Sequence, residues 1–347
     1  MLITKNFSLK RILLFSGHHF PWLILWMTLV VALYVYTDDG HHWMFIPWLP
    51  VSIIGTAVAF YVGFKNNSAY DRMWEARKIW GAIVNSSRSW GNVVRNYTSN
   101  LHNPIPIDDA EIKAWHQKLI FRHIAWLYAL RSQLLVATPW EHSNQRGFTG
   151  SFARRYQRLF GVGLVDDEVT RIELQLFLGK EEHDHLIAAK NTATQIIFKQ
   201  GEDLKKLRDL NLIDDFRHME MQKILNDFYD HQGKCERIKK FPLPRQYANM
   251  SFIFVCIFIF LMPFGLVPEF AKFGNIGIWM SIPFLVIVGW LYVVMEIVGD
   301  YSENPFQGMA NDIPMLSLCR TIEIDLLEML GETDLPAPIE AKKGILM

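Results

Sequence analysis

The chain has 347 residues, of which 50% are hydrophobic, and its 35 Lys and Arg balance its 35 Asp and Glu. This neutral balance argues against a nucleic-acid-binding surface and against an acidic interaction tail. Three cysteines without metal-ligand spacing predict neither a disulfide framework nor a zinc site: Cys235, Cys256 and Cys319.

Four long stretches contain no Asp, Glu, Lys or Arg, and they form two pairs. A helix of about 20 residues crosses a bilayer core of roughly 30 Å. Because backbone polar groups in lipid must be bonded internally, each stretch is predicted to be a transmembrane helix. Residues 1–19 precede them as a retained amphipathic segment. The stretches are Phe20–Thr37, Trp43–Phe64, Tyr247–Pro268 and Phe273–Met295.

The basic residues predict the orientation in the membrane. The hairpin connections, Asp38–His42 and Glu269–Lys272, are short and contain one basic residue. By the positive-inside rule, both termini and the region between the hairpins lie in the cytoplasm. The flanks on that side are basic: Lys5, Lys10, Arg11, Lys65, Arg72, Arg77, Lys78, Arg237, Lys239, Lys240 and Arg245.

The central region predicts an all-helical cytoplasmic domain, with no alternating pattern long enough for a sheet. Five parts are expected: segment 1–19, membrane helices 1 and 2 in 20–64, the helical domain 65–246, membrane helices 3 and 4 in 247–298, and a cytoplasmic segment 299–347. This last segment should pack on the helical domain through Pro314–Leu330 and end in a mobile tail, Glu332–Met347. The expected central helices are Asp71–Tyr97, Asp108–Leu135, Asp166–Gly179, Glu181–Gln200, Gly201–Leu210 and Ile213–Gln232.

The second apolar stretch carries Thr56, Phe60 and Phe64 at a spacing of four residues, so these side chains share one stripe of a helix. One interpretation is ordinary packing of aromatic side chains, which the spacing alone favours. The other is a pore-lining helix whose two rings form an apolar collar that gates by excluding water. Small residues on the same helix permit close approach of neighbours: Gly55, Ala57, Ala59 and Gly63.

The sequence after this stripe resembles the bestrophin family of ion channels, and most closely its bacterial members. The resemblance extends from the first apolar stretch to about Leu330. It rests on Gly63–Asn67, Tyr70–Arg77, Trp80-Gly81, Glu303–Phe306, Asn311–Pro314 and Ile322–Leu327 within the four-helix arrangement.

This resemblance implies a cyclic homopentamer around one central pore. It places a hydrophobic neck at Thr56, Phe60 and Phe64, where Thr56 departs from the usual aliphatic residue. It also implies a constriction at the cytoplasmic exit, near Phe216 or alternatively Ile213.

Animal members of the family hold calcium with an acidic run after the Asn-Pro-Phe turn, whereas Gln307–Asp312 offers one carboxylate. Calcium prefers six to eight oxygen ligands, so we expect no strong calcium gating and no metal or other cofactor, although a weak site near Asp312 stays open. Three acidic residues end the fourth helix, either as an ion-attracting ring or as structural charges, and the second interpretation is favoured: Glu296, Asp300 and Glu303.

The sequence therefore predicts a passive channel for small monovalent ions in a bacterial inner membrane. With no basic ring in the neck, it favours cations, and the alternative is an anion (chloride) channel of the same architecture. A membrane-anchored scaffold without conduction is a third possibility. No catalytic motif supports an enzyme, and the cluster Glu181–His185 is expected to be a solvated helix face.

Overall fold

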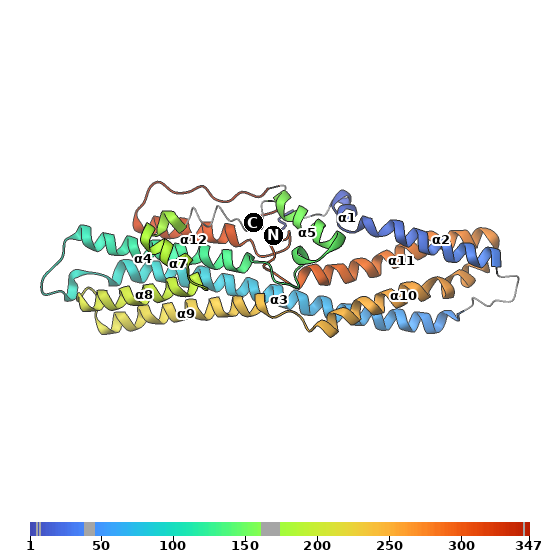
Figure 1. Cartoon of the computed structure of the whole chain (residues 1–347), viewed down its shortest axis with the longest axis horizontal. Coiled ribbons are helices and arrows are strands. Elements are labelled where there is room, and N and C mark those ends of the chain that lie inside the picture. The colour runs from blue at the N-terminus through green and yellow to red at the C-terminus, as the bar shows by residue number, and fades with distance from the viewer. Residues whose placement is uncertain (5, 7, 38–45, 161–173, 343) are drawn as a thin grey trace. The chain divides into compact units, whose positions relative to one another are not determined.

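The computed structural model describes residues 1–4, 6, 8–37, 46–160, 174–342 and 344–347. Helices dominate these residues, and their β-structure consists of isolated bridges, so the all-helical prediction is confirmed. The contacts divide the chain into two compact units (Figure 1). The apolar unit comprises Thr4–Arg72 and Pro242–Glu303, and the polar unit comprises Met1–Ile3, Met73–Phe241 and Asn304–Met347.

The apolar unit is built on four long helices. Helix α11 (Gly274–Ser302) packs against α10 (Arg245–Ala271) and α2 (Phe20–Thr37), and the first part of α3 (Trp48–Tyr97) completes the group. The short helix α1 (Leu9–Ser16) begins after Ser8, whose hydroxyl accepts the Arg11 N–H.

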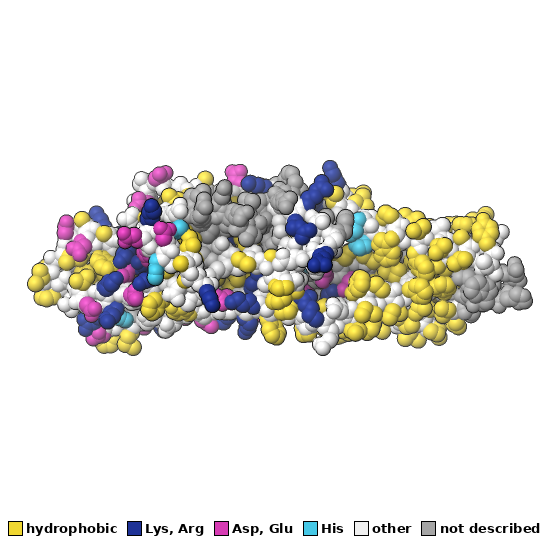
Figure 2. All heavy atoms as spheres, in the orientation of Figure 1, with side chains coloured by type: hydrophobic (Ala, Val, Ile, Leu, Met, Phe, Trp, Pro, Cys, Tyr) yellow, Lys and Arg dark blue, Asp and Glu magenta, His cyan; other side chains and the backbone are white. Residues whose placement is uncertain are grey.

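By length and composition, these four helices can each cross a membrane. Only 22% to 44% of their most apolar windows is buried, so most of this apolar surface requires lipid or another protein surface to cover it. Hydrophobic side chains accordingly gather over the long helices of this unit, toward the right of Figure 2.

Helix α3 is the largest departure from the expected element bounds. The sequence predicted a membrane helix ending near Phe64 and a separate helix, Asp71–Tyr97, but α3 runs through both as 50 continuous residues. The stretch contains no proline beyond its first turn, so the backbone has no reason to break where the composition changes from apolar to charged.

The polar unit surrounds α4 (Asp109–Leu135), which packs against α8 (Thr192–Asp209), α9 (Asp215–Lys240) and α12 (Met315–Leu330). The short helix α7 (Lys180–Ile187) packs on α8, and α5 covers Gly147–Phe160. The core contains the large side chains Trp80, Trp90, Trp126, Tyr128 and Phe228.

The expected break at Gly201 was wrong, because α8 passes through it. The break falls instead after Ile187, where the side chain of Asn191 caps α8 by accepting the Thr194 N–H at 3.0 Å. Of the remaining sequence expectations, the connection Asp38–His42 and most of the helix Asp166–Gly179 lie outside the described residues.

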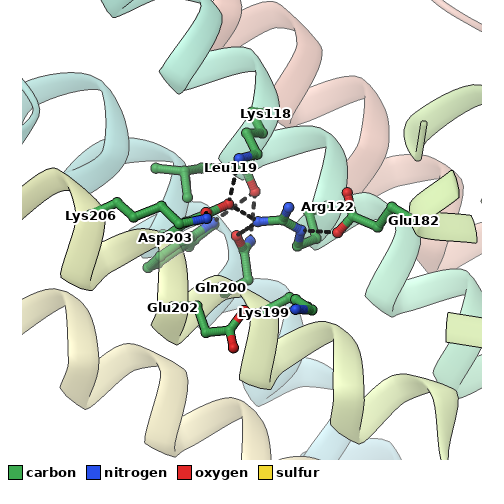
Figure 3. Close-up of polar contacts among 10 residues, drawn as sticks. Lys118, Leu119, Arg122, Glu182, Lys199, Gln200, Glu202, Asp203 and Lys206 are labelled. Carbon is green, nitrogen blue, oxygen red and sulfur yellow. Dashed lines mark hydrogen bonds and ion pairs between the residues drawn. The ribbon is translucent and has the colours of Figure 1, made fainter. Parts of the chain in front are cut away.

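A buried arginine joins α4, α7 and α8 (Figure 3). Arg122 donates to Glu182 at 2.7 Å and forms an ion pair with Asp203, which also accepts from Lys118 at 3.0 Å and Lys206 at 3.1 Å. The prediction of a solvated face at Glu181–His185 was therefore incomplete, because Glu182 belongs to this network and His183 is buried.

The two chain ends pair within the polar unit. The Ile3 N–H donates to the Gly344 carbonyl at 3.0 Å, and the Leu346 N–H donates to the Met1 carbonyl at 2.8 Å. The Ser317 N–H donates to the Met347 carbonyl at 2.6 Å, so the tail also reaches α12. These hydrogen bonds differ from the free, mobile end that the sequence suggested.

The core of the polar unit contains a histidine whose protonation opposes folding. His123 is buried between Trp126 and Phe228, and its Nε2 lies 2.9 Å from the Ser87 hydroxyl. Burial lowers the pKa of His123 to about 3, so its imidazole is neutral in the folded protein.

Acidification should therefore reveal His123 through stability. Below an unfolded-state pKa of about 6.5, only the unfolded chain binds this proton, so stability is lost as the pH falls from about 6.5 toward 3. Between pH 6.5 and 4.5, the decrease in the free energy of unfolding should be about 2 kcal/mol smaller for His123→Gln than for the unchanged protein. Thermal unfolding of both proteins across this pH range measures the difference. If the stability of both proteins fell by the same amount, the conclusion that His123 is neutral in the folded protein would be contradicted.

Candidate pore-lining stripe

Thr56, Phe60 and Phe64 lie on one exposed stripe of α3. The Phe60 side chain is 67% exposed and Phe64 is 63% exposed, and Leu49 and Ile53 continue the stripe toward the start of the helix. Such large exposed apolar side chains indicate contact with lipid, contact with a second copy of the chain, or the lining of a passage that tends to exclude water.

The Thr56 hydroxyl is already used within the helix. It donates to the Ser52 carbonyl at 3.0 Å, one turn earlier. The Thr56 hydroxyl, which departs from the family pattern, can therefore accept hydrogen bonds from its surroundings but has no free proton to donate. A ring of such residues is less polar than the residue type alone suggests.

The opposite face of α3 is packed in the apolar unit, with Val51, Val58 and Val62 in its core. Gly55 contacts Phe258 so closely that an added Cβ would lie 2.6 Å from the ring. Its carbonyl also accepts the Tyr292 hydroxyl at 3.0 Å. These contacts orient α3, and the side chains at Thr56, Phe60 and Phe64 project away from the core of the apolar unit as a result.

Charged residues meet at the end of the stripe. Lys65 follows Phe64 directly, is 1% exposed and forms an ion pair with Glu296. The second carboxylate oxygen of Glu296 accepts the Ser251 hydroxyl. Asp300 lies 4.0 Å from the Lys65 ammonium, at the limit of an ion pair.

The third acidic residue of this group, Glu303, is buried and accepts from Arg245 at 3.0 Å. The charges of Glu296 and Glu303 are thus balanced inside the apolar unit. The sequence placed Lys65 and Arg245 among the basic flanking residues and missed their pairing with these acids. The sequence did contain a signal for the Lys65–Glu296 pair: a lysine lies directly after one apolar stretch, and a carboxylate lies near the end of another.

The two candidates for the second constriction have different environments. Phe216, in the first turn of α9, is 83% exposed, whereas Ile213 is fully buried in the core of the polar unit. Ile213 therefore has a packing role in the polar unit, and Phe216 is the candidate that can face a passage.

The carboxylate of Asp312 has a protein partner. It is buried and accepts the Met309 N–H at 2.9 Å. Across the part of the chain that the structure describes, no group of three or more His, Cys, Asp or Glu side chains could hold a metal ion.

Comparison with known proteins agrees with this architecture. A voltage-dependent anion channel-forming protein of Escherichia coli K12 is 28% identical over 291 residues, which cover 84% of this chain and 79% of the relative. A protein of the same description from Ralstonia nicotianae is 26% identical over 352 aligned residues, which cover both chains fully.

A solved structure shares the fold. The crystal structure of a bacterial bestrophin homologue from Klebsiella pneumoniae superimposes with a TM-score of 0.71 at 22% identity, covering 91% of this chain and 98% of that one. Residues 18–328 also match the sequence model described as bacterial/fungal bestrophin protein. The chain therefore belongs to the bacterial and fungal bestrophin family, as its sequence motifs predicted.

Proposed function

We propose that this protein is a homopentameric channel that passes small monovalent anions passively across a bacterial inner membrane. The observation that carries the proposal is the exposed stripe of Thr56, Phe60 and Phe64 on a helix long and apolar enough to span the bilayer. Family membership supports a channel, and relatives named as anion channel-forming proteins support the ion.

In a cyclic assembly the stripe could line a central passage, which an isolated chain cannot form. Five copies of α3 around one axis would place five Phe60 and five Phe64 rings in a closed collar. These rings cannot replace an ion's water with hydrogen bonds, so ions would cross with much of their hydration retained. The collar would set the conduction barrier by its tendency to lose water.

The proposed ion reverses the cation preference inferred from the sequence. That preference rested on the lack of a basic ring in the neck. An acidic zone at the end of the fourth helix would have strengthened it, but Glu296 and Glu303 are buried and paired with Lys65 and Arg245. Their charges are therefore largely cancelled locally. The names of the relatives also favour the alternative, an anion channel of the same architecture.

We further propose that both termini and residues 65–246 lie in the cytoplasm, following the positive-inside rule. The passage would then have a second constriction formed by Phe216, which is exposed and lies outside the bilayer in this orientation. A scaffold without conduction would share the membrane helices but would have no need for a collar.

Reversal potentials under a potassium chloride gradient test the ion. In planar bilayers containing the purified protein, the current should reverse near the chloride equilibrium potential. Reversal near the potassium potential would restore the cation interpretation. The absence of protein-dependent current in bilayers and of flux in vesicles would favour a scaffold.

The combined substitution Phe60→Ala and Phe64→Ala tests the collar. Removing ten rings from the proposed pentamer should lower the barrier to wetting and raise the current about tenfold, which corresponds to about 1.4 kcal/mol. Phe252→Ala is the matched control, because Phe252 is 60% exposed on α10 and lies outside the stripe. An unchanged current in the double variant would count against the neck assignment.

A further inference from the structure

We propose that Lys65, Asn66, Ser251, Glu296 and Gly299 form a latch that sets the rotation of α3 about its own axis and so holds Phe64 and Phe60 in the exposed stripe. This latch is distinct from the collar, because none of its members lies in the stripe. Its role in conduction rests on the proposed channel function, but its effect on helix rotation does not.

The ion pair supplies the first constraint. Lys65 is 1% exposed and Glu296 is 7% exposed, so each charge depends on the other. Removing one partner from a buried pair leaves an uncompensated charge, which is strongly unfavourable. Because successive helix residues differ by about 100°, Lys65 can point at α11 only while Phe64 points well away from it.

A close backbone approach supplies the second constraint. The Asn66 amide donates to the Met295 carbonyl of α11 at 3.0 Å. Beside it, a Cβ added to Gly299 would lie 2.1 Å from the Asn66 side-chain oxygen, so a larger residue there would displace the Asn66 side chain. Lys65 and Asn66, which are consecutive in α3, thus contact α11 through an ion pair and through a close approach to its backbone.

The serine joins a third helix to the latch. The two oxygens of the Glu296 carboxylate accept from different helices, Oε1 from Lys65 of α3 and Oε2 from Ser251 of α10. A rotation of α3 that withdrew Lys65 would also unbalance the contact with α10. We call the observed arrangement engaged, and an arrangement without the Lys65–Glu296 pair released.

Thiol accessibility measures helix rotation directly. In a Cys256→Ser background, which removes the exposed cysteine, Phe64→Cys and the buried position Val62→Cys are introduced separately. Each protein is reconstituted in vesicles and treated with a water-soluble thiosulfonate and, in parallel, with a lipid-soluble maleimide. With the latch engaged, position 64 should react much faster than position 62 with at least one reagent.

Releasing the latch should change that ratio. Lys65→Met combined with Glu296→Gln removes both charges at similar volume, and the ratio of the rates at positions 64 and 62 should fall at least fivefold. The exchanged pair, Lys65→Glu with Glu296→Lys, should restore part of the ratio. Lys199→Met is the control, because it removes a partly exposed ion pair of α8 in the polar unit.

The glycine gives an independent variant that keeps every charge. Gly299→Ala should lower the same ratio by displacing the Asn66 side chain from the Met295 carbonyl. Asn66→Ala, which removes that hydrogen bond without adding a clash, should also lower it. Gly81→Ala, on α3 with nothing within 4 Å of the added carbon, is the matched control. An unchanged ratio in folded Gly299→Ala and in the charge-removed protein would overturn the latch.

The two reagents allow the latch and the proposed channel function to be tested separately. Preferential reaction of position 64 with the water-soluble reagent supports the pore, whereas reaction only with the lipid-soluble reagent places the stripe in hydrocarbon and contradicts the proposed function. The fivefold change in ratio tests the latch in both cases. In a conducting protein, latch release should also change the current per channel at least fivefold.

Discussion

The packed face of α3 determines where its exposed face points, and the functional interpretation depends on that relation. Gly55 brings the helix against Phe258, and Lys65 is committed to Glu296 by the cost of an unpaired buried charge. With those two positions directed inward, Phe60 and Phe64 must project outward. An apolar stripe of this kind needs lipid, protein or a water-poor passage beside it, and the family to which the chain belongs favours the passage.

Local patterns in the sequence predicted much of this arrangement. The absence of charge located the membrane helices, and α2 has the bounds that were expected, Phe20–Thr37. A spacing of four residues predicted the common face of Thr56, Phe60 and Phe64. Periodicity could not predict partners, because Lys65 and Glu296 are 231 residues apart. The continuity of α3 was also missed, since a change from apolar to charged composition resembles a domain boundary while leaving the helical backbone intact.

The acids at the end of the fourth helix show why residue counts are a poor guide to an electrostatic field. As an ion-attracting ring, the carboxylates at the end of the fourth helix would have created a field for cations, but the sequence favoured a structural role for them. A buried carboxylate held by a neighbouring cation contributes little beyond its own surroundings. Glu303 with Arg245 and Glu296 with Lys65 are such pairs. These acids stabilise the packing of α3, α10 and α11, and charges elsewhere along the passage, together with the collar, would select the ion.

The most direct test of the central claim is a cryo-electron microscopy structure of the full-length protein in lipid nanodiscs. The account predicts a ring of five subunits with one continuous axial passage, into which the Phe60 and Phe64 side chains of every subunit project. An assembly without such a passage, or one in which these side chains point into the lipid, would contradict it.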